Sequence, residues 1–216
     1  GISLCNMIVL QNVLKFFKIQ KNLYFTPAYN RFCVVVFIPE DCENHKSKRF
    51  AMKILLVNPN RYDAPPVPPL GLEYLYGTLT DTRHKPVLLD LCFAANPSET
   101  LKNTISEVQP DIIGVTIRQI DSALYYTNVF FLDEIKTYID VCKSFNIPIV
   151  LGGSGFSIMP EKVLKFTGAD YGIFGPGEFA FNRLLNALEN HEDPERIISG
   201  YAVFSENSYK NRRQQV

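Results

Sequence analysis

The chain has 216 residues, enough for one domain of ordinary size with a substantial core. Its 22 Lys and Arg balance its 22 Asp and Glu, so no net charge attracts nucleic acid or an anionic membrane. Five widely spaced cysteines exclude a zinc site or an iron–sulfur triplet, and no apolar run reaches the roughly 18 residues of a spanning helix. We therefore expect a cytoplasmic protein with reduced thiols and no metal-ligating or membrane-spanning residues.

The first 51 residues differ in character from the rest. They contain seven Lys and Arg against three Asp and Glu, whereas residues 52–216 contain 15 against 19. The segment has no sustained period, although FCVVVFI at 32–38 is typical of a buried strand, and it lacks the ordered features of a signal peptide. Since Met52 leads directly into a strand, we expect residues 1–51 to be an extension without a role in the site, translated from a mistaken gene start. An accessory region that docks on the domain is the alternative.

From Lys53 onward, short apolar runs alternate with helical stretches in five βα units. Strands that are apolar throughout are buried on both faces, as in a parallel sheet covered by helices. The pattern predicts an α/β fold of three layers, flavodoxin-like (Rossmann-like), whose five-stranded parallel sheet has the order 2-1-3-4-5. The predicted strands are 53–58, 86–91, 111–116, 147–152 and 171–175, and the predicted helices are 70–81, 97–108, 121–144, 159–167 and 177–190.

The loop after the first strand reads PNRYDAPPVPPLG and holds five prolines from Pro59 to Pro69. Proline fixes its own φ and keeps the preceding residue extended, so this loop is stiff. It contains neither GK[ST] nor GxGxxG, which excludes a Walker loop and a dinucleotide fingerprint. It also lacks the hydroxyl-rich sequence of a flavin phosphate loop and the clustered acidic residues of a receiver domain.

The loop after the third strand, TIRQID at 116–121, supplies the candidate site residues Thr116, Ile117 and Arg118. Thr116 offers a hydroxyl at a strand end and Arg118 offers a cation, while Asp121 is predicted to cap the helix at 121–144. The purely structural interpretation makes these a turn residue, a solvated charge and a cap.

Glycine-rich bends follow the fourth and fifth strands, at neighbouring positions along the sheet edge. Glycine lets backbone approach a ligand closely and permits positive φ, so paired bends favour a broad surface for an extended ligand, although each bend by itself is consistent with a simple turn. The residues concerned are Gly152, Gly153, Ser154 and Gly155 in the first bend, and Gly175, Gly177 and Glu178 in the second.

An ordered set of motifs resembles the cobalamin-binding domain at the N-terminus of cobalamin-dependent radical S-adenosylmethionine enzymes. The resemblance covers about residues 52–190 in the family's order and spacing. The motifs are PPLGLEYLYGTL (68–79), VLLDL (87–91), QPDIIGVTI (109–117), IVLGGSGFSIMPE (149–161) and ADYGIFGPGE (169–178).

The resemblance implies that cobalamin lies at the strand ends, with its nucleotide tail in the sheet crevice. Thr116 would line the channel of the tail, and Gly152 and Gly153 would let the tail pass close to backbone. The second glycine bend would border the tail or the ring edge, and the loop at 58–70 would form the floor below the cobalt. The cofactor-binding residues implied are Pro69, Thr116, Ile117, Arg118, Gly152, Gly153, Ser154, Gly175, Gly177 and Glu178.

Two departures limit what the resemblance implies. The chain lacks the DxHxxG motif of cobalamin-dependent mutases; its histidines are His45, His84 and His191, and we expect the last two to be surface residues. It also lacks CxxxCxxC, the motif that holds a [4Fe-4S] cluster for S-adenosylmethionine. We therefore expect the noncatalytic, cobalamin-binding half of a radical enzyme of the methyltransferase type. Its partner would be the absent catalytic radical domain, which would bind the cluster and S-adenosylmethionine.

The expected organisation is an extension at 1–51, a cobalamin-binding domain at 52–192, and a linker or the start of the catalytic domain at 193–216. Two other functions remain open on the sequence. One is a flavodoxin-like domain that binds a mononucleotide, and the other is a noncatalytic interaction domain whose glycines only shape turns.

Overall fold

The computed structural model describes residues 36–37, 52–62, 67–80, 82–122, 126, 128–198 and 202–204. These residues form a seven-stranded sheet in the order β1-β3-β2-β4-β5-β6-β7. The five central strands run parallel in the predicted order 2-1-3-4-5, so the predicted fold is confirmed. They are β2 (Lys53–Asn58), β3 (Lys85–Asp90), β4 (Ile112–Thr116), β5 (Ile149–Gly152) and β6 (Tyr171–Ile173).

Two short antiparallel strands extend the sheet beyond the five that the sequence predicts. β1 (Val36–Phe37) pairs with β3, and it falls inside the strand predicted at 32–38. β7 (Ala202–Phe204) pairs with β6 at the other edge. Apart from β1, the predicted extension at 1–51 lies outside the described residues, and the proposed domain boundaries stay predictions.

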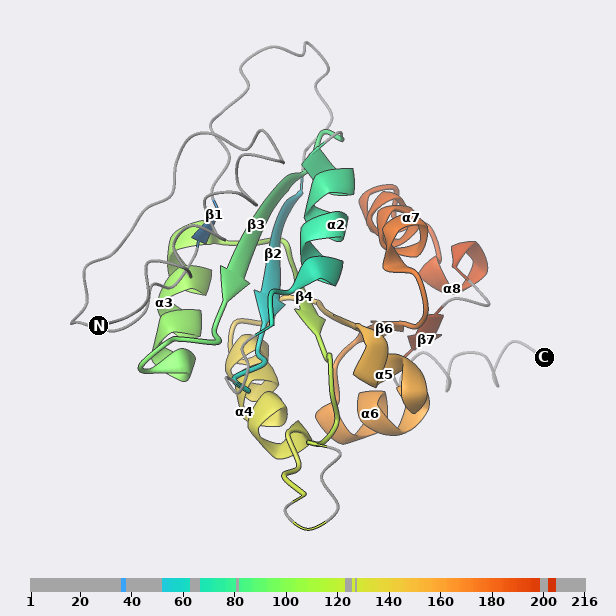
Figure 1. Ribbon diagram of the computed structural model, residues 1–216. Coiled ribbons are helices and arrows are strands. Elements are labelled where there is room, and N and C mark those ends of the chain that lie inside the picture. Colours follow the sequence, from blue (N-terminus) through green and yellow to red (C-terminus); the bar gives the residue numbers. More distant parts are fainter. Residues whose placement is uncertain are drawn as a thin grey trace.

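Helices cover both faces of this sheet, so the molecule has three layers (Figure 1). α2 and α7 lie on one face, and α3, α4, α5 and α6 contribute to the packing on the other. The helices are α2 (Leu70–Thr80), α3 (Pro97–Val108), α4 (Leu132–Lys143), α5 (Ser154–Ile158), α6 (Pro160–Thr167), α7 (Gly177–Glu189) and α8 (Pro194–Ile197).

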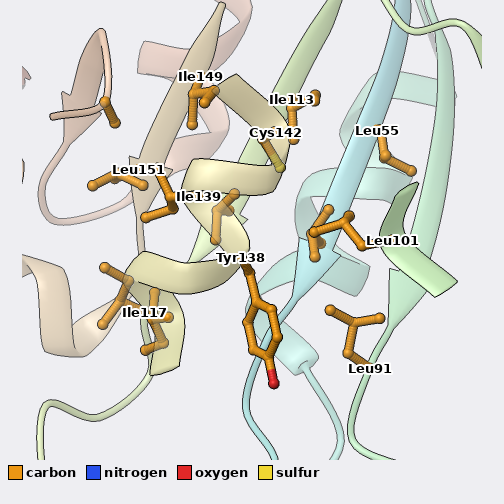
Figure 2. Packing of buried hydrophobic residues seen from close by; sticks show 14 of the residues in the cluster. Leu55, Leu91, Leu101, Ile113, Ile117, Tyr138, Ile139, Cys142, Ile149 and Leu151 are labelled. Carbon is orange, nitrogen blue, oxygen red and sulfur yellow. The ribbon is translucent and has the colours of Figure 1, made fainter. Parts of the chain in front are cut away.

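Side chains of each central strand alternate between two hydrophobic clusters. In β2, Leu55 and Val57 point to the α3/α4 face, whereas Ile54 and Leu56 point to the α2/α7 face. Figure 2 shows the α3/α4 cluster, in which Tyr138, Ile139 and Cys142 of α4 pack over the sheet residues. This double burial explains why the interiors of the central strands are apolar on both faces.

The fourth predicted helix begins later than the sequence indicates. α4 starts at Leu132, and Asp121 instead forms an isolated bridge with Phe130, so the prediction that Asp121 caps this helix is wrong. The N–H of Ser122 donates to the Val129 carbonyl and the N–H of Phe131 donates to the Ile120 carbonyl, both at 2.9 Å. These hydrogen bonds hold residues 129–131 in an extended conformation against residues 120–122. The β-branched and aromatic residues at 129–131 also weaken helix formation there.

The prediction that His84 lies on the surface is also wrong. It lies in the turn from α2 to β3, and its side chain is 3% exposed, with Nδ1 3.8 Å from Oε1 of Glu189 at the end of α7. Burial and the neighbouring Arg83 lower the pKa of His84, and Arg83 itself pairs with Glu189. His191 is exposed as predicted, and His45 lies outside the described residues.

Candidate functional site

A cleft of about 650 Å³ opens between α2 and α7 at the carboxyl ends of β4 and β5. Its floor is the α2/α7 face of the two strands, where side-chain alternation places Gly114 of β4 and Gly152 of β5. Leu72 and Leu75 of α2 form one wall, and Phe181 of α7 belongs to the other. The cleft therefore occupies the crevice position that the 2-1-3-4-5 strand order predicts.

The two floor glycines keep bulky side chains out of the cleft. A Cβ atom on Gly152 would have the Ile173 carbonyl oxygen, at 3.7 Å, as its nearest neighbour, so the space above this residue is open. A Cβ atom on Gly114 would lie 3.0 Å from Cδ2 of Leu56 and 3.6 Å from the Phe181 ring. The space above Gly114 is therefore filled by Leu56 and Phe181, whereas a ligand can lie directly on the backbone of Gly152.

Nine of the ten predicted cofactor-binding residues line this cleft, from four separate segments. Ile117 is the exception, because it is a fully buried residue of the loop after β4. Its N–H donates to the Gly152 carbonyl at 2.7 Å, and its carbonyl accepts from the N–H of Gly155 at 2.8 Å. The nine lining residues are Pro69, Thr116, Arg118, Gly152, Gly153, Ser154, Gly175, Gly177 and Glu178.

Gly153 and Gly155 are required by the protein's own packing. Gly153 has φ of +99°, and a Cβ atom there would lie 2.6 Å from Oγ1 of Thr116 and 2.7 Å from the Ile117 carbonyl oxygen. A Cβ atom on Gly155, within α5, would lie 2.9 Å from the Arg118 backbone. The bend after β5 therefore sits tightly against the loop after β4, and only Gly152 provides open space.

Side-chain hydrogen bonds join the bends to each other and to the loop after β4. Oγ of Ser154 donates to the Arg118 carbonyl at 2.9 Å, and the N–H of Gly175 donates to Oγ of Ser157 at 3.0 Å. Gly175 has φ of +73°, a conformation that glycine adopts without strain. As the sequence indicates, Pro160 opens the next helix, α6.

The loop after β2 is fixed by a chain of amide hydrogen bonds at its start. Nδ2 of Asn58 donates to Oδ1 of Asp90 at 2.9 Å, and Oδ1 of Asn58 accepts from the N–H of Asn60 at 3.2 Å. Oδ1 of Asn60 in turn accepts from the N–H of Tyr62 at 3.2 Å. Burial raises the pKa of Asp90, and its hydrogen bonds from Cys92 and Asn58 oppose that shift. Residues 63–66 lie outside the described residues.

A second cavity of about 170 Å³ adjoins the cleft, because Thr116 and Arg118 line both. It lies between the loop after β2 and the start of α4, and it contains Arg61, Gln119 and Glu134. The Arg61 guanidinium donates to the Ala94 carbonyl at 3.2 Å and lies 3.8 Å from Oε1 of Glu134. The sequence motifs gave no indication of this cavity.

Burial and the Glu134 hydrogen bond stabilise the protonated hydroxyl of Tyr138, which donates to Oε1 of Glu134. They raise the pKa of Tyr138 to about 12, and the neighbouring Arg61 opposes this shift. This group therefore stays protonated at neutral pH and holds Glu134 at the wall of the second cavity.

Several residues of the cleft were not predicted from the sequence. Gly114 stands in an apolar strand, where an isolated glycine indicates close approach of a ligand or another chain, so its signal was present in DIIGVT. The apolar walls carried no signal separate from ordinary core positions, because helix and strand residues of the core have the same composition. The lining residues that were not predicted include Leu56, Leu72, Leu75, Val150, Ile173 and Phe181.

The chemistry of the cleft favours a large ligand with little charge. Arg118 and Glu178 are the charged residues among those that line it, and most of the rest are apolar or glycine. Within the described ranges no group of three or more His, Cys, Asp or Glu side chains is arranged to hold a metal ion, and no helix is long and apolar enough to cross a membrane. A polyphosphate would find few cations here, whereas a bulky neutral cofactor fits.

Comparisons with known proteins give the same picture. The family model of the B12 binding domain matches residues 63–185. Tryptophan 2-C-methyltransferase of Streptomyces laurentii is 33% identical over 153 residues, which are 69% of this chain and 25% of that protein. The chain thus spans about a quarter of this relative.

Solved structures show the same relationship. The radical S-adenosylmethionine methyltransferase TsrM from Kitasatospora setae, with cobalamin and a [4Fe-4S] cluster bound, is 30% identical with a TM-score of 0.67, over 72% of this chain and 29% of that one. The cobalamin-dependent radical enzyme OxsB, with aqua-cobalamin and S-adenosylmethionine bound, shares the fold at 17% identity and a TM-score of 0.55, over 72% and 22%. The chain therefore belongs to the B12-binding domain family and is homologous to the cobalamin-binding part of the methyltransferase TsrM.

Proposed function

We propose that this domain holds cobalamin in the cleft between α2 and α7, as the cofactor-binding half of a radical S-adenosylmethionine enzyme of the methyltransferase type. The observation that carries the proposal is the floor of the cleft, where Gly152 leaves backbone open to a ligand at the end of a central strand. A family that binds B12 needs such a slot for the nucleotide tail, and the cleft volume of about 650 Å³ suits a large group.

Each segment of the cleft has its own part in this proposal. Thr116 would present its hydroxyl to the tail, which would lie on Gly152, while the bend at 175–178 would border the tail or the ring edge. The stiff loop after β2, held by Asn58 and Asn60, would form the floor below the cobalt. Cobalamin would supply methyl-transfer chemistry at its cobalt, and the protein residues would bind, orient and shield it.

The loop after β2 contains no histidine, so it has no imidazole to offer the lower face of the cobalt. Of the described histidines, His84 is buried against Glu189 at the far end of α7, and His191 follows the same helix. We therefore expect bound cobalamin to show no spectroscopic signature of a histidine ligand from this loop.

The test is direct binding. The full chain mixed with hydroxocobalamin should retain a red chromophore through gel filtration at a ratio close to one per chain. Flavin mononucleotide serves as the matched probe, because it represents the competing flavodoxin-like function. A colourless protein peak with hydroxocobalamin, or retention of the flavin instead, would contradict the proposal.

Exposed apolar side chains support a catalytic domain as the partner of this one. They lie on the segments that follow β2, β4, β5 and β6, and exposed apolar side chains are typical of surfaces that contact another protein domain. The chain lacks CxxxCxxC, so the [4Fe-4S] cluster and S-adenosylmethionine would belong to that partner domain. The exposed residues are Leu70, Tyr74, Tyr126, Val129, Phe130, Ile158, Phe166 and Phe179.

The parent enzyme is tested at the level of the gene. An open reading frame that continues in frame beyond Val216 should encode CxxxCxxC within the following domain. A stop codon at that point, with no separate radical protein encoded beside it, would contradict the enzyme proposal and leave cobalamin binding to stand alone.

A further inference from the structure

The second cavity adjoins the cofactor cleft and is lined by both polar and apolar side chains. It shares the lining residues Thr116 and Arg118 with the cleft, so it lies next to a ligand held there. Its volume of about 170 Å³ is several times the roughly 30 Å³ share of one water molecule in the liquid. The packing of the Tyr62 ring against Phe131, with centroids 6.0 Å apart, fixes part of its wall.

Gln119 leaves a polar atom without a partner at this cavity. Its Oε1 atom is buried and has no hydrogen-bond donor within the described part of the chain, while the residue itself lines the cavity. A buried acceptor without a donor costs about 1–3 kcal/mol. A small rotation of the side-chain amide into the cavity would remove this cost if a donor were present there.

Two of the charged groups around the cavity, Arg61 and Glu134, are engaged with each other, and a third, Arg118, lines both this cavity and the cleft. Arg61 bonds to the Ala94 carbonyl and faces Glu134, which also accepts the Tyr138 hydroxyl. A neutral group with both donors and an acceptor would complement Gln119 without breaking these contacts. A primary amide has this pattern, and it pairs with the Gln119 amide in either orientation.

We propose that the second cavity receives one of the primary amide side chains at the edge of the corrin ring, with Gln119 as its hydrogen-bond partner. This inference rests on the proposed binding of cobalamin. Gln119 thereby selects corrinoids that carry an uncharged amide at one position of the ring and fixes how the ring is turned above the strand ends.

The experiment compares hydroxocobalamin with its monocarboxylic acids, in which a single peripheral amide is replaced by a carboxylate. The full chain is used in three forms: wild type, Gln119→Leu, and Asn103→Leu as a matched amide-to-leucine control on the exposed side of α3. Affinity is measured by the change in corrinoid absorbance, and thermal unfolding of each variant reports its folding. If Gln119→Leu is unfolded, Gln119→Asn, whose shortened amide cannot reach the same distance, takes its place.

The expected result is a loss of about tenfold in hydroxocobalamin affinity for Gln119→Leu and none for Asn103→Leu, since one hydrogen bond contributes about 1.4 kcal/mol. One monocarboxylic acid should bind wild type about tenfold more weakly than hydroxocobalamin, and Gln119→Leu should not distinguish the two. The inference alone would be overturned if wild type and Gln119→Leu bind all corrinoids equally, or if the affinity losses caused by the substitution and by the carboxylate are additive. Tighter binding of a monocarboxylic acid than of hydroxocobalamin would overturn it as well. Failure of wild type to bind hydroxocobalamin would overturn the proposed function and this inference with it.

Discussion

The end of β5 and the bend that follows it use glycine for opposite purposes. In the bend, Gly153 and Gly155 touch the loop after β4 so closely that a Cβ atom has no room. On the α2/α7 side, Gly152 faces a cleft, and the helices that cover this face meet near Glu189 but part at the sheet's carboxyl edge. Adjacent glycines in one motif can therefore serve either packing or ligand access, and the atoms that lie against each glycine decide which.

The largest effect should come from Gly153→Ala. The added Cβ would collide with Thr116 and the Ile117 carbonyl at a residue whose φ is +99°, so strain and overpacking combine. We expect the free energy of unfolding, measured with urea, to fall by about 2–5 kcal/mol. A loss below about 1 kcal/mol would show that the bend can move away from the loop, which would break the comparison.

Gly152→Val should affect cofactor binding strongly and stability only slightly, unlike Gly153→Ala. Its side chain would enter the cleft, where the nearest neighbour of the Cβ is 3.7 Å away, and valine suits a strand. We expect the free energy of unfolding to stay within about 1 kcal/mol of wild type while hydroxocobalamin affinity falls by about 100-fold, or about 2.7 kcal/mol. Retained affinity in a folded variant would show that no part of the cofactor lies on this strand.

Two further glycines separate the need for positive φ from the need for space. A Cβ atom would meet nothing within 4 Å at Gly175 or at Gly77, but Gly175 has φ of +73° and Gly77 lies in α2. Gly175→Ala should therefore lower the free energy of unfolding by about 1–2 kcal/mol, and Gly77→Ala should raise it by about 0.5–1 kcal/mol. Both are read from urea denaturation, and equal effects of the two substitutions would show that φ is not the cause.

The smallest effect concerns pH and the end of the α2/α7 face where the two helices meet. Burial and Arg83 lower the pKa of His84, so below its ordinary value of about 6.5 the unfolded chain binds a proton before the folded chain does. Stability should fall as the pH drops below that value and level off below the lowered pKa. In urea denaturation, His84→Gln should reduce the change of the free energy of unfolding with pH. His191→Gln, at an exposed site, should leave that pH dependence unchanged. An unchanged pH dependence in His84→Gln would exclude His84 as its source.

Much of the site could be predicted because strand ends and glycines are visible in sequence. Parallel strands place their carboxyl ends along one edge, so Thr116, Gly152 and Gly175 had to lie near one another once the strands were recognised. Asp121 was misassigned because its capping signal was real but local, and the pairing of Ser122 with Val129 overrode it. Ile117 stays a prediction as a cofactor-binding residue, although its side chain is fully buried and does not line the cleft.

The sequence alone determined the alternation of apolar strands and helices, the order of the parallel strands, the stiff loop after β2 and the absence of histidine from that loop. These follow from short-range patterns of hydrophobicity, proline and glycine. Only the tertiary structure decided that Gly152 opens a cleft while Gly153 fills a contact, that His84 is buried, and that Gln119 lines a second cavity. Each of these features depends on which segment, distant in the sequence, packs against the residue. A local sequence pattern does not specify that contact.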